Sequence, residues 1–334
     1  MKDATLIYNP RAGQLNGLAK VEPAADVWRA AGWRVTLEPT LGPGHATELA
    51  RAAAEGGAGV VLAAGGDGTL GQVADGLAGS ATALAPLPMG TANALARELR
   101  LPRLQLLDPN APVEAATALL GGRVQAIDLN YVQTRGWAGH ALLWAGIGAD
   151  GYLVQHLEPR PTWSKRLGPV GYSIQALTVL HRLPAMNAVV KVDNQAVEGD
   201  WLLIVISNCR LYAGGWVQLS GDAVFDDGYF EVWLFRAGEF STRLMPTRVG
   251  LMARYFTGVT LNLQEWDPGV LNLVGKRVVV ETRPRMPCQR DGETAGHTPL
   301  TCEIRPRSLR LLVPQATPRA LFGQRGTPLA ELHP

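Results

Sequence analysis

Apolar runs and helix-like spacings alternate along the first third of the chain. Residues 60–64 and 84–87 are continuous apolar runs of the length expected for buried strands. Behind each run, apolar residues recur at the i, i+3, i+4, i+7 spacing of one helix face: Leu70, Val73, Ala74 and Leu77, then Ala92, Leu95, Ala96 and Leu99. Strand–helix alternation of this kind predicts a parallel sheet covered by helices on both faces.

The alternation extends to both sides of these runs. Strands are expected at 5–8 and 33–37, and helices at about 18–31 and 46–55. Pro112 suits the first turn of another short helix, which Gly121 and Gly122 would end. Parallel sheets bind ligands at the carboxyl ends of their strands, so the segments that follow these strands are candidates for a site.

After Gly122 the hydrophobic period changes from helical to two. The alternating sets include Ile127, Leu129 and Tyr131; Ala188, Val190 and Val192; Phe230, Val232 and Leu234; Val278, Val280 and Thr282; and Leu309, Leu311 and Val313. Many short strands with turns between them predict an antiparallel, sandwich-like domain. Helices are expected to interrupt it near 170–183 and 240–256. We place the boundary at 124, with an α/β domain over 1–124 and a β-rich domain over 125–315.

Two glycine-rich turns carry the strongest chemical signal. Gly65-Gly66-Asp67-Gly68-Thr69 follows the run at 60–64, and residues 88–93, with the sequence Pro-Met-Gly-Thr-Ala-Asn, follow the run at 84–87. Glycines let backbone N–H groups approach a ligand, and a helix N-terminus behind them favours an anion. Two such turns from neighbouring strands would converge on a nucleotide phosphate. A carboxylate at Asp67 repels phosphate unless a cation lies between them, which suggests magnesium-nucleotide chemistry.

Together with Asn9-Pro10-Arg11-Ala12-Gly13, these two turns resemble the diacylglycerol kinase catalytic family, which includes the soluble bacterial diacylglycerol kinases, the YegS-like lipid kinases and the sphingosine and ceramide kinases. The resemblance implies an N-terminal fold like those of NAD kinase and phosphofructokinase, with ATP as substrate. It also implies that the C-terminal tail, 316–334, returns to the first domain, with a short helix expected between 318 and 332. The implied nucleotide-binding residues are Asn9, Arg11, Gly13, Thr40, Gly65, Gly66, Asp67, Gly68, Thr69, Gly90, Thr91 and Asn93. Thr40 is also explained as a plain turn residue.

Two positions depart from the family pattern. The first turn usually continues, after the threonine and an apolar residue, with Asn-Glu, whereas this chain has Gly71 and Gln72. A neutral amide thus replaces a carboxylate that could contact metal or nucleotide. The loss of this carboxylate puts both the affinity for metal and the turnover rate in doubt, although Gln72 can still hydrogen-bond.

The second domain should supply the acceptor side of a lipid kinase. Gly146-Ile147-Gly148-Ala149-Asp150 resembles the family's GxGxDA motif, with Gly151 in place of the alanine, and Arg290-Asp291-Gly292-Glu293 resembles its DGE motif. Phosphorylation of an alcohol needs a group that accepts the hydroxyl proton. We assign this base role to the pair Asp291 and Glu293, with Glu293 preferred, and expect Asp150 to join their network.

A third motif, Asp226-Asp227-Gly228, resembles the turn that holds a structural Mg²⁺ ion in bacterial members of the family. Carried over to this chain, the ligands are Asp227 and the backbone carbonyls of Val224 and Tyr229. The alternative is an ordinary Asp-Gly turn that closes a hairpin.

Composition limits the remaining choices. The 334 residues are 47% hydrophobic and 18% charged, with a net charge of +2, which indicates a globular protein and argues against a nucleic-acid partner. Cys209, Cys288 and Cys302 have no metal-ligand or disulfide spacing, so reduced cysteines in a cytoplasmic protein are expected. We find no signal peptide and no apolar run near the ~20 residues of a membrane span.

The sequence therefore predicts an ATP- and Mg²⁺-dependent lipid kinase that is cytoplasmic and transiently membrane-associated. Diacylglycerol is the acceptor that the resemblance implies, with phosphatidylglycerol or a long-chain amino alcohol as alternatives. The segment from His156 to Leu183, with basic and aromatic residues beside an apolar helix, suits a bilayer surface; the alternative is a core helix with a solvated basic start. A kinase for a soluble acceptor such as NAD, a non-catalytic lipid- or nucleotide-binding regulator, and a homodimer formed by the second domain all remain open.

Overall fold

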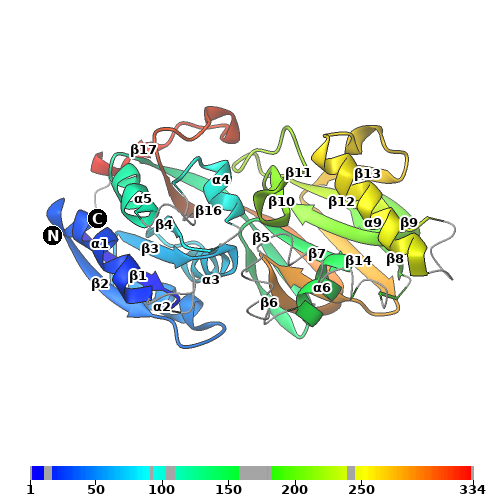
Figure 1. Cartoon of the computed structure of the whole chain (residues 1–334), viewed down its shortest axis with the longest axis horizontal. Helices are drawn as coiled ribbons and strands as arrows, with labels where there is room; N and C mark the ends of the chain where they lie inside the picture. The colour runs from blue at the N-terminus through cyan, green and yellow to red at the C-terminus, as the bar shows by residue number, and fades with distance from the viewer. Residues whose placement is uncertain are drawn as a thin grey trace.

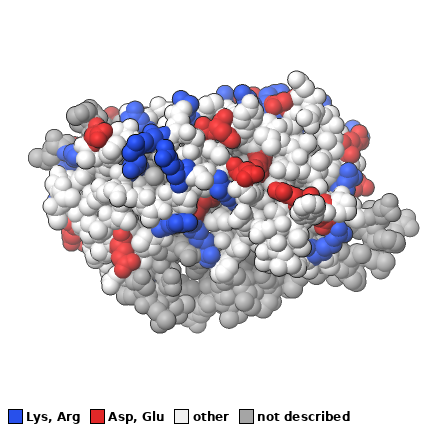
Figure 2. Space-filling model, turned by 90° about the horizontal axis from the view of Figure 1, so that it is seen from above, with Lys and Arg blue, Asp and Glu red and all other residues white. Residues whose placement is uncertain are grey.

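The computed structural model describes residues 2–10, 17–90, 93–102, 110–157, 179, 183–184, 186–238 and 245–331, and the description that follows concerns these residues. Two lobes lie side by side along the long axis, with the N-terminal third of the chain in one and most of the later strands in the other (Figure 1). Lysine and arginine mix with aspartate and glutamate on the face seen in Figure 2, in keeping with the small net charge.

The N-terminal lobe is built on four strands that pair in parallel in the order β4-β3-β1-β2. Their bounds are β1 Lys2–Tyr8, β2 Trp33–Pro39, β3 Val60–Gly65 and β4 Ala83–Pro88. Every residue of β3 and β4 is buried, as their uninterrupted apolar character requires. The sequence-based strands agree with these elements to within a few residues at each end.

Helices cover this sheet. Their bounds are α1 Gly17–Ala30, α2 His45–Glu55, α3 Asp67–Leu77, α4 Ala94–Glu98 and α5 Ala111–Leu120. Helix α2 packs on α3, and α1 packs on α5, where the Trp28 indole N–H donates to the Ala116 carbonyl at 3.1 Å. Pro112 lies in the first turn of α5 and Gly121 follows its last residue, as expected.

The second lobe is mainly antiparallel. Its strands are β5 Arg123–Arg135, β6 Trp137–Ala141, β7 Trp144–Gly148, β8 Met186–Val192, β9 Gln195–Ser207, β10 Leu211–Tyr212, β11 Val217–Gln218, β12 Phe230–Arg236, β13 Val270–Gly275, β14 Arg277–Arg283, β15 Pro287–Arg290 and β16 Glu293–Val313. Two helices, α6 Ala149–Leu157 and α9 Met245–Thr260, interrupt them. The helix expected near 240–256 thus corresponds to α9, and the one near 170–183 falls almost entirely outside the described residues.

Strands β5 and β16 join the two lobes. The end of β16 pairs in parallel with β4 through Arg310 and Leu311, while most of its length pairs antiparallel with β5. The predicted boundary at residue 124 falls within β5, so the hydrogen-bonded sheet continues across it. Sequence periodicity could not show this, because the last residues of β16 alternate like any strand of the second lobe.

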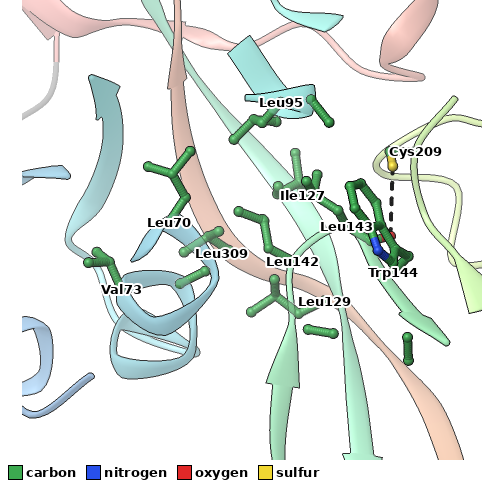
Figure 3. Packing of buried hydrophobic residues seen from close by; sticks show 14 of the residues in the cluster. Leu70, Val73, Leu95, Ile127, Leu129, Leu142, Leu143, Trp144, Cys209 and Leu309 are labelled. Atoms are coloured by element: carbon green, nitrogen blue, oxygen red, sulfur yellow. Dashed lines mark hydrogen bonds between the residues drawn. The ribbon is translucent and has the colours of Figure 1, made fainter. Parts of the chain in front are cut away.

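A single apolar core also spans the lobes. In Figure 3, Leu70 of α3 and Leu95 of α4 lie near Ile127 of β5 and Leu309 of β16. Leu142, in the connection between β6 and β7, lies with them. Cys209 lies at the edge of this cluster, and all three cysteines are buried and free, as the spacing indicated.

The C-terminal segment runs back over the junction of the lobes. Its short strand β17, Thr327–Pro328, pairs with the start of β5, and the Thr317 hydroxyl donates to the Leu99 carbonyl at 2.9 Å. The segment forms two 3₁₀ turns, at Arg319–Leu321 and Leu329–Glu331, in place of the expected helix. The Asp226 carboxylate accepts hydrogen bonds from the backbone N–H groups of Gly323 and Gln324, at 2.6 and 3.1 Å.

Glu98 makes the stability of this fold depend on pH. Its carboxylate is buried and accepts from the Arg210 N–H at 2.7 Å, and burial raises its pKa to about 7. A folded-state pKa above the ordinary value means that the folded protein binds more protons, so the free energy of unfolding falls as the pH rises from about 4.5 to about 7.

We expect Glu98→Gln to remove much of this dependence. Urea unfolding at pH 6 and pH 8 should show a smaller loss of stability in the variant than in the parent chain. Exposed Glu114→Gln is the control, and an equally steep pH dependence in Glu98→Gln would contradict the assignment.

Candidate active site

The carboxyl ends of the four parallel strands bring most of the predicted nucleotide residues to one edge. Asn9 follows β1, and its N–H donates to the Ala64 carbonyl at 3.1 Å, while the Thr40 N–H, after β2, donates to the Tyr8 carbonyl at 2.9 Å. The Met89 N–H similarly donates to the Gly65 carbonyl at 2.9 Å. The segments after all four strands are therefore neighbours. Arg11, Gly13 and Thr91 lie outside the described residues.

The two glycine-rich turns touch. A Cβ on Gly90 would lie 2.8 Å from the Gly66 Cα, so a larger residue at Gly90 would push the turns apart. Gly66 is the N-cap of α3, and no side chain caps the helix there, while the Thr69 side chain lies against Gly65. The first turn of α3 therefore presents its backbone donors and its positive dipole end where an anion can approach.

Asp67 has a structural role that the sequence did not reveal. Its carboxylate is buried and accepts from the Ala94 and Leu95 N–H groups, at 2.9 and 3.4 Å, at the start of α4. Burial raises its pKa to about 6, against the effect of these hydrogen bonds. Asp67 thus fastens the second turn to the first; that it also contacts nucleotide or metal stays a prediction.

Asn93 shapes the second turn from within. It adopts the left-handed conformation at φ 63°, and its side-chain amide donates to the Gly90 carbonyl at 2.6 Å. Within the described part of the chain, its Oδ1 is buried without a hydrogen-bond partner. Such an acceptor would be satisfied by a donor from a bound ligand.

The Asp-Gly pair of the late motif forms the tight turn between β15 and β16. Asp291 and Gly292 both have positive φ, at 45° and 83°, and Arg290 pairs with Glu293 across the turn. The Asp291 carboxylate is buried and accepts from the N–H groups of Leu142, Leu143 and Trp144, at 2.8, 2.8 and 3.2 Å. Burial raises its pKa.

Glu293 points elsewhere and reaches α3. The Gln72 amide donates to its Oε1 at 2.5 Å, the Arg290 guanidinium lies 3.6 Å from its Oε2, and 36% of its side chain is exposed. A Cβ on Gly68, in the first turn of α3, would lie 3.1 Å from the Glu293 Cγ. The late motif thus places an accessible carboxylate beside the glycine-rich turn, whereas Asp291 ties the hairpin to the β6–β7 connection.

Asp150 supports this hairpin through Gln289, a residue that the sequence analysis did not single out. The Gln289 amide donates to Asp150 Oδ2 at 2.6 Å, and its Oε1 accepts from the Gly292 N–H at 2.8 Å. Burial of the carboxyl group raises the Asp150 pKa to about 6. The predicted network with Asp150 is therefore made through an intervening amide. The sequence carried no signal for Gln289, because its burial and both of its partners depend on tertiary packing.

Two family models match successive parts of the chain: the diacylglycerol kinase catalytic domain over residues 3–132 and the YegS C-terminal NAD kinase beta sandwich-like domain over residues 147–313. The chain belongs to the diacylglycerol kinase family.

Named relatives of this family match most of the chain. A Bacillus subtilis protein named diacylglycerol kinase is 27% identical over 302 residues, which is 90% of this chain and 92% of its own. A Staphylococcus epidermidis protein, also named diacylglycerol kinase, is 26% identical over 89% of this chain and 88% of its own. A solved structure of a Bacillus anthracis diacylglycerol kinase has a TM-score of 0.67 at 20% identity, over 95% and 98%; at this identity the likeness concerns the fold.

The turn at 226–228, which resembles a metal-binding turn of bacterial family members, is held by hydrogen bonds to other parts of the chain. The Asp227 Oδ1 accepts from the Tyr229 N–H at 2.9 Å, and the Gly228 N–H donates to Asp128 Oδ2 at 2.6 Å. Asp226 binds the C-terminal segment. Among the described residues, β12, which follows the turn, pairs with β9 and β13, and β11, which precedes it, pairs with β10, so the interpretation of this turn as a plain hairpin closure is wrong. No group of three or more His, Cys, Asp or Glu side chains within the described residues could hold a metal ion. The set Asp227, Val224 and Tyr229 has one carboxylate and two carbonyls, and it stays a prediction.

Gly71 of α3 makes room for the hairpin that β15 and β16 form. A Cβ there would overlap the Asp291 carboxylate. Alanine stabilises a helix interior by about 1 kcal/mol over glycine, but Gly71→Ala should displace Asp291 and lower the free energy of unfolding by roughly 1–3 kcal/mol. Urea unfolding measures this.

Gly250→Ala on α9 is the matched control, because a Cβ there meets nothing within 4 Å. It should raise stability by about 0.5–1 kcal/mol. If Gly71→Ala gained stability in the same way, the close packing of α3 against the hairpin would be wrong.

Proposed function

We propose that this chain transfers the γ-phosphoryl group of ATP to the free hydroxyl of a diacylglycerol. The observation that carries the proposal is the position of Glu293 beside Gly68, at the N-terminus of α3 where the two glycine-rich turns meet. The phosphate of an ATP bound by these turns and the carboxylate that accepts the hydroxyl proton would therefore meet at one place. The family assignment makes the chain a phosphotransferase with an alcohol acceptor.

The donor side relies on backbone groups. The uncapped first turn of α3 and the turn at Gly90 would bind the phosphates of ATP through N–H donors, in the manner of other glycine-rich turns. Asp67 keeps these turns together by its bonds to α4. Mg²⁺, when bound with ATP, would neutralise charge on the phosphates, and Asp227 with the carbonyls of Val224 and Tyr229 would hold a structural ion.

The acceptor side relies on Glu293. As the lipid oxygen attacks the γ-phosphorus in line, the new O–P bond forms and the bond to the ADP oxygen breaks. The Glu293 carboxylate takes the hydroxyl proton, which requires that the side chain be ionised and accessible. Its partial exposure supports this role, whereas the Asp291 carboxylate is already engaged by three backbone donors.

A lipid acceptor requires contact with a bilayer surface. Within the residues that the structure describes, no helix has the length and apolar character to cross a membrane. We infer a peripheral and transient contact, for which the predicted segment 156–183 is the sequence-based candidate. Comparison of activity on diacylglycerol vesicles with activity on a short-chain, dispersed diacylglycerol tests it, with the vesicle rate expected to rise with surface area.

The acceptor is tested by incubating the purified protein with γ-labelled ATP, Mg²⁺ and separate acceptors: diacylglycerol, phosphatidylglycerol, a long-chain amino alcohol and NAD. Label in the phosphorylated diacylglycerol is the expected result. Label found only in the NAD product would move the chain to the soluble-acceptor class. Nucleotide binding without transfer to any acceptor would favour the regulator.

A further inference from the structure

Gln72 is held at both ends of its side-chain amide. Its Oε1 accepts from the Gly44 N–H at 3.1 Å, at the start of α2, and its Nε2 donates to Glu293 Oε1 at 2.5 Å. The residue is 6% exposed, and its backbone carbonyl accepts from the Thr47 hydroxyl at 2.9 Å. Gln72, a buried residue of the N-terminal lobe, thus contacts the Glu293 carboxylate of the other lobe, the proposed acceptor of the hydroxyl proton.

The chemistry of these partners fixes the orientation of the amide. The Gly44 N–H can only donate, so the oxygen of Gln72 must face it and the NH₂ group must face Glu293. A hydrogen bond from an amide to an ionised carboxylate favours the ionised form and holds it in one direction. A glutamate at this position would meet Gly44 equally well but would set one carboxylate against another.

We propose that Gln72 is a positioning residue, which holds Glu293 ionised and directed at the lipid hydroxyl. The inference rests on the proposed function of Glu293. Gly71 belongs to the same arrangement, because its missing Cβ lets the Asp291 carboxylate lie against α3. The departure from the family's Asn-Glu pair therefore accommodates and orients the hairpin.

The groups that surround Glu293 come from three elements. Helix α3 supplies the neutral amide of Gln72, and β15 supplies the Arg290 guanidinium at 3.6 Å. Asp291, in the turn between, directs its carboxylate to the backbone of 142–144, away from Glu293. Asp67, whose pKa the Asp291 charge helps to raise, directs its carboxylate to α4. Gln72 and Arg290 are therefore two contacts through which the direction of Glu293 is set.

Gln72→Glu tests the proposal because it keeps the size of the side chain and the acceptor for Gly44 while it removes the donor to Glu293. We expect kcat at pH 7 to fall by about 10-fold or more, with KM for ATP unchanged. The acidic limb of the pH–kcat profile should move to higher pH, because two facing carboxylates share a proton. A structural role alone would lower stability without moving this limb.

Gln264→Glu is the matched control. Gln264 is also buried, and its amide donates to the Gln218 and Leu219 carbonyls away from the site. This variant should lose stability and keep the parent kcat per folded molecule and the parent pH profile. Parent-like kcat and pH profile in Gln72→Glu would overturn the proposal.

Crystal structures of the parent chain and Gln72→Glu give a readout that does not depend on activity. The parent should show the Gln72–Glu293 bond, and the variant should show Glu293 turned away from position 72. An unmoved Glu293 would overturn the positioning role, whether or not transfer is observed. A parent chain that keeps this bond but phosphorylates no acceptor would instead refute the proposed function.

Discussion

Glu293→Gln should lower kcat by roughly 10²- to 10⁴-fold while the protein stays folded. The amide has nearly the shape of the carboxylate but cannot accept the hydroxyl proton. Stability should change by less than about 1 kcal/mol, because the Glu293 side chain is 36% exposed and its ion pair with Arg290 is long, at 3.6 Å. Initial rates with ATP and diacylglycerol vesicles, with thermal unfolding of the same preparations, measure both effects.

Glu303→Gln provides the matched comparison for this substitution. Glu303 lies on the same strand, where its partners are Arg277 and Arg305. It should keep the parent rate. A Glu293→Gln enzyme that retained more than about a third of the parent kcat would place the proton acceptor elsewhere.

Asp291→Ala should have its largest effect on folding. Removing the carboxylate leaves the buried N–H groups of Leu142, Leu143 and Trp144 without their acceptor, and each unsatisfied buried donor costs about 1–3 kcal/mol. We expect the free energy of unfolding to drop by at least ~3 kcal/mol in urea titrations. Burial raises the pKa of Asp291 against the effect of Arg290 and of these three hydrogen bonds, so the carboxylate occupies this position at an electrostatic cost.

Asp291→Asn should fall between the parent and the alanine variant. An asparagine oxygen can replace the acceptor for Leu143 and Trp144, but its NH₂ group would face the Leu142 N–H. Glu293→Gln, two residues away, is the control for general disturbance of the turn. A loss below ~1 kcal/mol in Asp291→Ala would show that water replaces the carboxylate, and would contradict an anchoring role.

Local patterns predicted the elements of the N-terminal lobe and the two glycine-rich turns. Both turns lie directly behind uninterrupted apolar runs, and such runs need no tertiary information to be recognised. The Asp-Gly turn between β15 and β16 was similarly readable, because its two residues must adopt positive φ.

Contacts between distant parts of the chain were not predictable in this way. Asp67 binds α4, Gln72 reaches Glu293 some 221 positions later, and Asp226 anchors the C-terminal segment. In each case a buried polar side chain meets a partner whose position depends on the packing of whole elements. The sequence supplied the chemical type of each residue, and the fold supplied its partner.

The long strand β16 has a consequence for any attempt to dissect this protein. It begins at Glu293, and its far end closes the flank of β4, a strand with no exposed residue. A fragment that stops at residue 132, where the catalytic-domain match ends, would lack β16. The backbone N–H and C=O groups along that edge of the apolar strand β4 would then be unpaired and exposed. Such a fragment should precipitate when expressed alone and recover only when the missing half is supplied in trans.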